Sequence, residues 1–234
     1  MKNLISVFFL GFIAFSFVAC KGKGGDASTV AGDTTAVNVS TTDGGSQVFH
    51  VVTTASKLYW EGYKPAQNRT HTGTVNISKG TLSLKGDMIQ GGSVVFDMNS
   101  ITDTDLEGEM KSKLEAHLKG TAQGKENDFF NVTQYPTGKF EITKVATLEN
   151  DAEANTMIYG NLTLKDITRP VAFKANVNVV NGTLTATAPL FKIDRTEWGI
   201  KVLSKKFFDN LKDDFVDDQF GLRIELRAES GKDI

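Results

Sequence analysis

Two observations predict an all-β protein. From residue 48 onward, apolar and polar residues alternate with a period of two in about eight separate runs, and helical periodicity is confined to one segment. Each run has one apolar and one polar face, as antiparallel strands do when one face of their sheet is in water. Because about eight strands exceed what a flat open sheet comfortably carries, we expect closure into an antiparallel barrel or folding into a sandwich.

The expected strands follow one another along the chain, with turn residues between them. Their apolar faces are carried by Val75 and Ile77; Leu82 and Leu84; Val94, Phe96 and Met98; Phe140 and Ile142; Ile158, Gly160, Leu162 and Leu164; Val171, Phe173, Ala175, Val177 and Val179; Leu184, Ala186, Ala188 and Leu190; and Leu222, Ile224, Leu226 and Ala228. Lys79–Gly80 and Asn181–Gly182 are the predicted turns, and the second has the sequence of a tight hairpin. Small inward residues such as Gly160 and Ala175 indicate space inside the sheet.

One segment has the periodicity of a helix. Leu106, Met110, Leu114 and Leu118 recur every four residues with charges between them, which predicts an amphipathic helix over about residues 105–118. We expect this helix to pack across a barrel mouth or seam. Outside it, the adjacent pairs Phe129–Phe130 and Phe207–Phe208 are expected to place one ring inside and one outside, because neighbouring side chains of an extended chain point in opposite directions.

Composition excludes several classes of protein. The 234 residues carry 26 basic and 28 acidic side chains, a net charge of −2 that leaves no electrostatic footprint for nucleic acid. A single cysteine excludes an intramolecular disulfide and every cysteine-rich zinc site. We expect no metal site, since His50, His71 and His117 lack ligand spacing and the acidic pairs near residues 213–218 lack a calcium-loop pattern. No nucleophile elbow or phosphate loop occurs, so we expect no enzyme and no cofactor.

The N-terminus reads as an export signal. A short basic start precedes about fifteen apolar residues, fewer than the roughly 20 that a spanning helix needs. The stretch ends in Phe17-Val18-Ala19-Cys20, which resembles the bacterial lipobox. We therefore expect residues 1–19 to be a cleaved signal peptide and Cys20 to be a lipidated N-terminus that anchors the protein in a membrane. An uncleaved anchor, or an ordinary signal with an incidental cysteine, is the alternative.

Residues 20–47 and 48–230 differ in composition. The first segment is rich in Gly, Ser, Thr and Asp and has no aromatic residue, so it is expected to be a flexible tether. The second carries all the alternating runs and is the expected barrel domain. Lys21 stands where familiar inner-membrane lipoproteins have Asp, which favours an outer-membrane location, on the periplasmic or the surface face.

Six short segments, in order over residues 48–229, carry a family resemblance. They are 58–62 (LYWEG), 71–74 (HTGT), 99–102 (NSIT), 115–119 with 128–136 (EAHLK and DFFNVTQYP), 160–171 (GNLTLKDITRPV) and 194–200 (DRTEWGI). Together they resemble the YceI-like family of bacterial exported proteins. Residues 120–127 depart from the family pattern, which usually has a residue or two there, and so put the expected entrance shape and ligand class in question.

The resemblance implies a lipocalin-like barrel of about eight strands that binds a polyisoprenoid lipid or an isoprenoid quinone. We expect the apolar part of such a ligand to contact Trp60, Phe96, Phe140, Phe173 and Trp198. His117 is expected near the head group, and Arg169 or Arg195 suits a lipid diphosphate, because guanidinium binds phosphate through two hydrogen bonds. The alternative is a filled barrel or sandwich that serves as a surface interaction or scaffold module without a small-molecule ligand.

Overall fold

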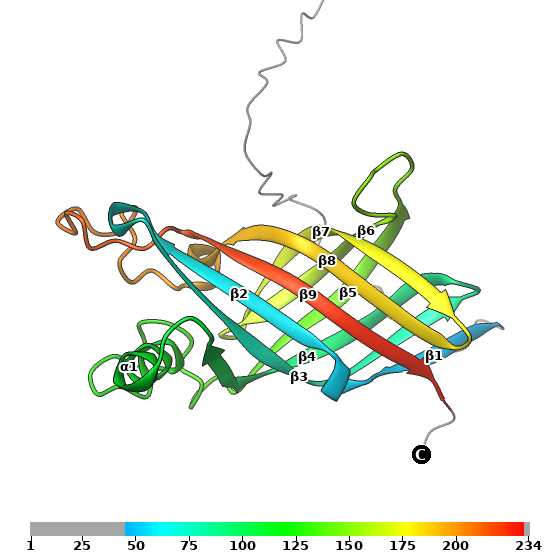
Figure 1. The fold of residues 1–234 in the computed structure, drawn as a ribbon, viewed down its shortest axis with the longest axis horizontal. Helices are drawn as coiled ribbons and strands as arrows, with labels where there is room; N and C mark the ends of the chain where they lie inside the picture. The colour runs from blue at the N-terminus through cyan, green and yellow to red at the C-terminus, as the bar shows by residue number, and fades with distance from the viewer. Residues whose placement is uncertain (1–44, 232–234) are drawn as a thin grey trace, which may run out of the picture.

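Nine antiparallel strands wrap around one axis in residues 45–231, the part of the chain that the structure, a computed structural model, describes (Figure 1). The strands are β1 (Ser46–Val51), β2 (Lys57–Lys64), β3 (Arg69–Lys85), β4 (Met88–Asp103), β5 (Thr137–Thr147), β6 (Thr156–Leu164), β7 (Ile167–Val180), β8 (Thr183–Asp194) and β9 (Gln219–Ser230). Each strand from β3 to β9 pairs with its neighbour in sequence. The expected signal peptide, Cys20 and most of the tether lie outside the described residues.

The first two strands share one position in the barrel. β1 pairs with residues 81–85 of β3 and 228–230 of β9, and β2 pairs with residues 69–76 and 221–225 of the same two strands. A 3₁₀ turn, Thr53–Ala55, separates them, and the buried Ser56 hydroxyl fixes the break by donating to the Val52 carbonyl at 2.8 Å. Nine strands in eight positions form a closed antiparallel barrel, which confirms the predicted fold.

The hairpin turns confirm one prediction and correct another. Asn181 and Gly182 join β7 to β8 with positive φ angles of 50° and 74°, as the predicted tight turn requires. The predicted turn at Lys79–Gly80 is wrong, because β3 runs through it and turns at Gly86 instead. Gly80 serves close packing: a Cβ there would lie 2.7 Å from a methyl group of Val51.

A second correction comes from β8. Ala188 pairs with Ile224, and Phe191 is the next β8 residue with a partner, Leu222. β8 therefore has one more residue than β9 over this interval, and a bulge forms at Pro189 and Leu190. Beyond the bulge the inward and outward positions are exchanged. Leu190, predicted to face inward, is exposed, while Phe191 points into the barrel.

The predicted helix is confirmed as α1, Gly108–Lys119. It begins three residues later than the leucine pattern suggests, because Asp103 Oδ1 accepts the Leu106 N–H at 2.7 Å and holds the preceding turn outside the helix. Gly120, with a φ of 71°, ends it. Leu114 and Leu118 face the barrel, whereas Met110 is 59% exposed. Within residues 45–231, no helix has the length and apolar character needed to cross a membrane.

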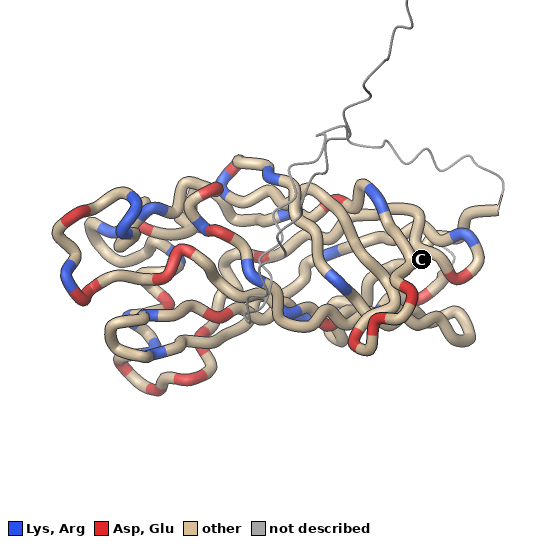
Figure 2. The backbone as a smooth tube through the Cα atoms, turned by 90° about the horizontal axis from the view of Figure 1, so that it is seen from above, with Lys and Arg blue, Asp and Glu red and all other residues tan. Residues whose placement is uncertain are grey.

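The two ends of the barrel differ. At one end lie β1 and the end of β9, where Phe49, Leu84, Leu184 and Ala228 are almost completely buried. The other end carries α1, the turn Pro65–Gln67 and the long connection 199–218 (Figure 1). Basic and acidic residues are interspersed around the barrel in the view of Figure 2 rather than separated by sign.

Candidate functional site

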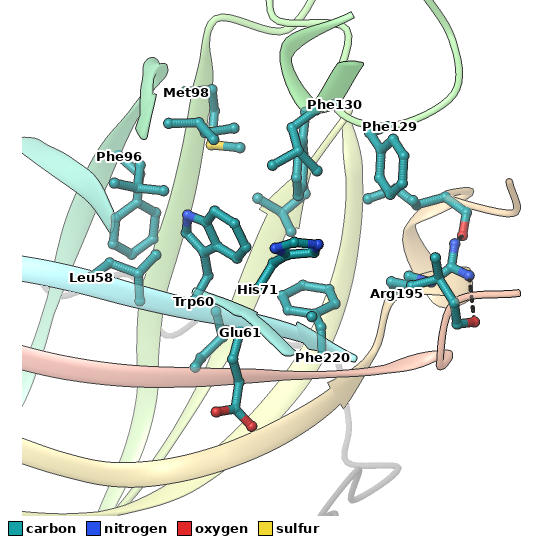
Figure 3. Close-up of a pocket in the computed structure, with 18 of the residues that line it drawn as sticks. Leu58, Trp60, Glu61, His71, Phe96, Met98, Phe129, Phe130, Arg195 and Phe220 are labelled. Carbon is teal, nitrogen blue, oxygen red and sulfur yellow. Dashed lines mark hydrogen bonds between the residues drawn. The ribbon is translucent and has the colours of Figure 1, made fainter. Parts of the chain in front are cut away.

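A cavity of about 250 Å³ lies inside the barrel toward the α1 end. Its wall is almost entirely apolar and draws residues from most of the strands, among them Leu58, Val75, Phe96, Met98, Leu162, Val171, Phe173 and Leu222. Within the described chain, the lining includes six residues with charged or imidazole side chains: Glu61, Lys64, His71, His117, Arg195 and Asp217. All six lie toward the α1 end, where the Glu61 carboxylate points away from the cavity (Figure 3), so the interior of the cavity is apolar and its polar groups are confined to that end.

A second cavity of about 60 Å³ lies deeper in the barrel. Ala175, Ala186 and Ala188 contribute to its wall, in keeping with the space expected from small inward residues. Gly160 does not leave such space, because the Phe140 ring occupies the position where its Cβ would stand. Phe140 and Phe173 line both cavities and therefore stand between them.

Trp60 is the largest side chain in the wall of the main cavity that can donate a hydrogen bond. Its indole lies between Phe96 and His71 in the view of Figure 3. Gly73 on the neighbouring strand makes this possible, since a Cβ there would collide with the indole ring and the Thr102 carbonyl. The Trp60 Nε1–H is buried and finds no hydrogen-bond partner among the described residues. A buried donor of this kind costs free energy until an acceptor reaches it.

The residues that directly follow the segment 120–127 lie against His117 and Lys165 at the α1 end. His117 Nε2 lies 2.7 Å from Asp128 Oδ2, and the His117 ring packs edge-on against Phe129 with centroids 5.0 Å apart. Lys165 donates to the Phe129 carbonyl at 2.6 Å, and burial lowers the pKa of this lysine. These contacts attach residues 120–130 to the barrel.

Neither phenylalanine pair divides between inside and outside as expected. Phe129 and Phe130 both line the cavity, because the chain turns there rather than running extended (Figure 3). Phe207 and Phe208 are 46% and 48% exposed, in the turns of the connection 199–218.

Arg195 reaches the cavity wall but is engaged in holding the connection 199–218. Its side chain is 3% exposed, and its five N–H groups donate to the carbonyls of Ile200, Val202, Val216 and Asp217 and to the Asp218 carboxylate. Burial lowers the pKa of Arg195, against the opposing effect of the nearby carboxylates. No N–H remains on this guanidinium for a phosphate in the described arrangement.

The structure brings together six of the eight residues expected to bind a ligand. Trp60, Phe96, Phe140, Phe173, His117 and Arg195 all line the main cavity, whereas Trp198 and Arg169 lie outside its lining. Trp198 is fully buried and donates to the Leu162 carbonyl at 3.0 Å, and Arg169 forms an exposed ion pair with Glu197.

Several lining residues were not predicted from the sequence. Phe220, the second residue of β9, lies two positions before Leu222, so the period-two pattern contained a signal for it. Phe191 was hidden by the bulge at Pro189 and Leu190, which the alternation does not indicate. One ring of the Phe129–Phe130 pair was expected inside, and the irregular chain after the helix places both there.

A closed antiparallel barrel with an internal apolar cavity is an architecture that holds small molecules. The YceI-like domain family matches residues 49–228, and the chain belongs to this family. No curated protein matches the chain.

Solved structures that are similar to this chain have low sequence identity to it. A polyisoprenoid binding domain from Saccharophagus degradans, implicated in plant cell wall breakdown, has a TM-score of 0.55 at 11% identity, over 79% of this chain and 99% of that chain. BcnA of Burkholderia cenocepacia has a TM-score of 0.48 at 16% identity, over 76% and 98%. The YCEI protein of Campylobacter jejuni has a TM-score of 0.45 at 18% identity, over 62% and 75%.

Proposed function

We propose that this protein binds an apolar lipid of the polyisoprenoid or isoprenoid quinone type, with the chain in the main cavity and the head group at the α1 end. The observation that carries the proposal is the lining, which is apolar in the interior of the barrel and has polar groups only toward the α1 end. Such a wall suits an amphiphile whose apolar chain lies inside the barrel and whose head group stays at the α1 end. The polyisoprenoid binding domain from Saccharophagus degradans, which has the same fold, supports this ligand class.

Burial of the chain is the main source of binding free energy in this proposal. Each buried methylene contributes about 0.8 kcal/mol, so a dozen contribute about 10 kcal/mol before the cost of association. Such a ligand needs few polar contacts. The unpartnered Trp60 Nε1–H favours a lipid with an oxygen acceptor, such as a prenol hydroxyl or a quinone carbonyl.

A pair of matched variants tests the binding proposal. Val171→Trp places a large ring in the main cavity, whereas Leu190→Trp places the same ring on the outer surface of β8. In native mass spectrometry of the full chain with a prenol series and a quinone, we expect the wild type and Leu190→Trp to carry a lipid adduct. Val171→Trp should bind at least about tenfold more weakly, a loss of about 1.4 kcal/mol. Equal binding by all three proteins, or none by the wild type, would contradict a ligand inside the barrel.

We further propose that the protein acts as a binder or carrier rather than an enzyme. The sequence contains no nucleophile elbow or phosphate loop, and the cavity wall is mainly hydrocarbon. Incubation with a labelled prenyl diphosphate tests this directly. We expect the label to remain in the intact lipid, and conversion proportional to protein concentration would contradict the proposal.

Anchoring at Cys20 in the bacterial envelope is part of the same proposal. Residues 21–44 would span at most about 80 Å when fully extended, from the anchor to the first described residue. The described chain enters the barrel at β1, the end opposite α1, so a tether of this length leaves the polar end free to face a membrane or to turn away from it.

Fractionation of cells tests the anchor. Wild-type protein is expected in the outer-membrane fraction, with a lipid-sized mass on the N-terminal peptide. Cys20→Ser should release the protein from the membrane without changing lipid binding in the barrel. Membrane association that persists in Cys20→Ser would count against lipidation.

A further inference from the structure

Outside the apolar wall, three metal-ligand side chains converge where β3 and β4 pair at the α1 end. His71 comes from β3, Asp103 is the last residue of β4, and Asp105 follows two residues later. One ligand atom from each residue lies within 4.8 Å of the other two. His71 Nδ1 and Asp105 Oδ2 form a hydrogen bond of 2.9 Å, which an ion bound to both atoms would replace.

Asp103 provides an independent sign that a positive charge belongs here. The residue is 0% exposed, and its Oδ1 accepts the Leu106 N–H, but its Oδ2 has no hydrogen-bond partner among the described residues. A buried carboxylate oxygen without a partner is costly, because it has lost water and gained nothing. The unpartnered Oδ2 belongs to the carboxylate that converges with His71 and Asp105, so a cation held by the three residues would supply its missing partner.

Neighbouring backbone groups hold the two aspartates in place, and the site remains accessible to an ion from solvent. The Thr72 N–H donates to Asp105 Oδ1 at 2.6 Å, so both aspartates are oriented by backbone hydrogen bonds, as the ligands of metal sites commonly are. His71 and Asp105 are partly exposed, so an ion can enter and water can complete its coordination. Imidazole nitrogen with two carboxylate oxygens suits Zn²⁺ or Mn²⁺, whereas Ca²⁺ prefers oxygen alone.

We propose that His71, Asp103 and Asp105 bind one divalent transition-metal ion, Zn²⁺ or Mn²⁺, beside the polar end of the cavity. The spacing of the three histidines along the chain predicted no metal site. Here one histidine acts with two aspartates, and strand pairing rather than sequence spacing brings them together. The inference does not depend on the proposed lipid ligand, although His71 belongs to both the cavity wall and the ion site.

Calorimetric titration of the full chain in detergent with ZnCl₂, after removal of metals by a chelator, tests the inference. We expect one ion per chain and a higher midpoint of thermal unfolding with the metal. Asp105→Asn and Asp103→Asn should each weaken Zn²⁺ binding at least about tenfold. Asp105 is the safer variant for folding, since its side chain is the more exposed of the two.

Asp128→Asn is the matched control. Asp128 also pairs with a histidine, His117, but the described chain provides no third ligand there. Zinc binding that survives in Asp128→Asn and fails in the other two variants would support the site. Failure of the wild type to bind either Zn²⁺ or Mn²⁺, or equal binding by all the variants, would overturn it. Repeating the titration after delipidation separates this result from the lipid proposal, because the ion should bind in either state.

Discussion

Phe140 and Phe173 pack with ring centroids 5.4 Å apart and stand between the two cavities of the barrel. Phe173 in turn stacks on Phe191, with centroids 4.6 Å apart and ring planes 9° from parallel. Phe96 and Ile224 also line both cavities, so they form a partition together with Phe140 and Phe173, whereas Phe191 lines the main cavity alone. For the proposed lipid, we expect this partition to limit how far the chain extends from the α1 end.

Removing one ring of the partition is expected to lengthen the preferred ligand. Phe173→Ala joins the main cavity to the smaller one, so the variant should favour longer prenols than the wild type in native mass spectrometry. It should also lose up to about 3 kcal/mol of unfolding free energy, because Phe173 is only partly buried. Phe208→Ala removes an exposed ring and should change neither property. An unchanged chain-length preference in Phe173→Ala would show that the partition does not limit the ligand.

A methyl group on Gly160 is expected to disturb the same partition. The added Cβ would meet the Phe140 ring and the Glu141 carbonyl, so the ring must move. We expect Gly160→Ala to lower the unfolding free energy by about 1–3 kcal/mol in urea denaturation. Gly62→Ala, where a Cβ meets nothing within 4 Å, should be neutral or slightly stabilising. Equal stability of the two variants would contradict the close packing at Gly160.

Arg195 is expected to fold the connection 199–218 onto the barrel. Arg195→Met leaves the carbonyls of Ile200, Val202 and Val216 without their donor, so hydrogen exchange and limited proteolysis should increase within this connection. The unfolding free energy should fall by at least about 2 kcal/mol. In Arg169→Met, which loses an exposed ion pair, the change should be less than about 1 kcal/mol. This role would be refuted if residues 199–218 of Arg195→Met were as well protected from hydrogen exchange and proteolysis as those of the wild type.

Asp194 is expected to make stability depend on acid pH. Burial acts to raise the pKa of Asp194, but hydrogen bonds from Lys206 and Thr196 outweigh it, and the pKa lies below the ordinary value of 3.8. A carboxyl whose pKa is lowered by folding stabilises the protein above its unfolded pKa. That stabilisation disappears as the pH falls through the folded pKa.

Asp194→Asn should therefore be less stable than the wild type at about pH 7, and this difference should shrink below about pH 3. Urea denaturation at both pH values measures the effect. Asp87→Asn, in the exposed β3–β4 turn, is the control and should match the wild type throughout. A stability difference for Asp194→Asn that is the same at both pH values would contradict the assignment.

The alternation of side chains was sufficient to predict an antiparallel barrel or sandwich, because one face of every strand must be buried, and the family resemblance selected the barrel. Trp60, Phe96, Phe140 and Phe173, named as ligand contacts with that resemblance, all lie in the cavity wall. The alternation failed where the chain departs from regular pairing. The bulge at Pro189 reversed the faces of Leu190 and Phe191, and the turns after α1 brought Phe129 and Phe130 to the same side.

The type of a residue was also less informative about its role in a site than the groups that surround it in the fold. Arg195 has the chemistry to bind phosphate, but five local acceptors already occupy it. His71 and Asp103 are far apart in sequence, and the pairing of β3 with β4 brings them together. Neither outcome follows from a pattern along a single strand, since both depend on which segments become neighbours in space.

The shared position of β1 and β2 has a consequence for how the protein is made. Both strands need β9, residues 219–230, as their second neighbour, so the ring stays open until almost the whole described chain has been delivered. Until then, β8 and the β1–β2 position expose unpaired backbone edges, which are sites of aggregation. A partly synthesised chain therefore keeps these edges exposed until residues 219–230 are available to close the barrel.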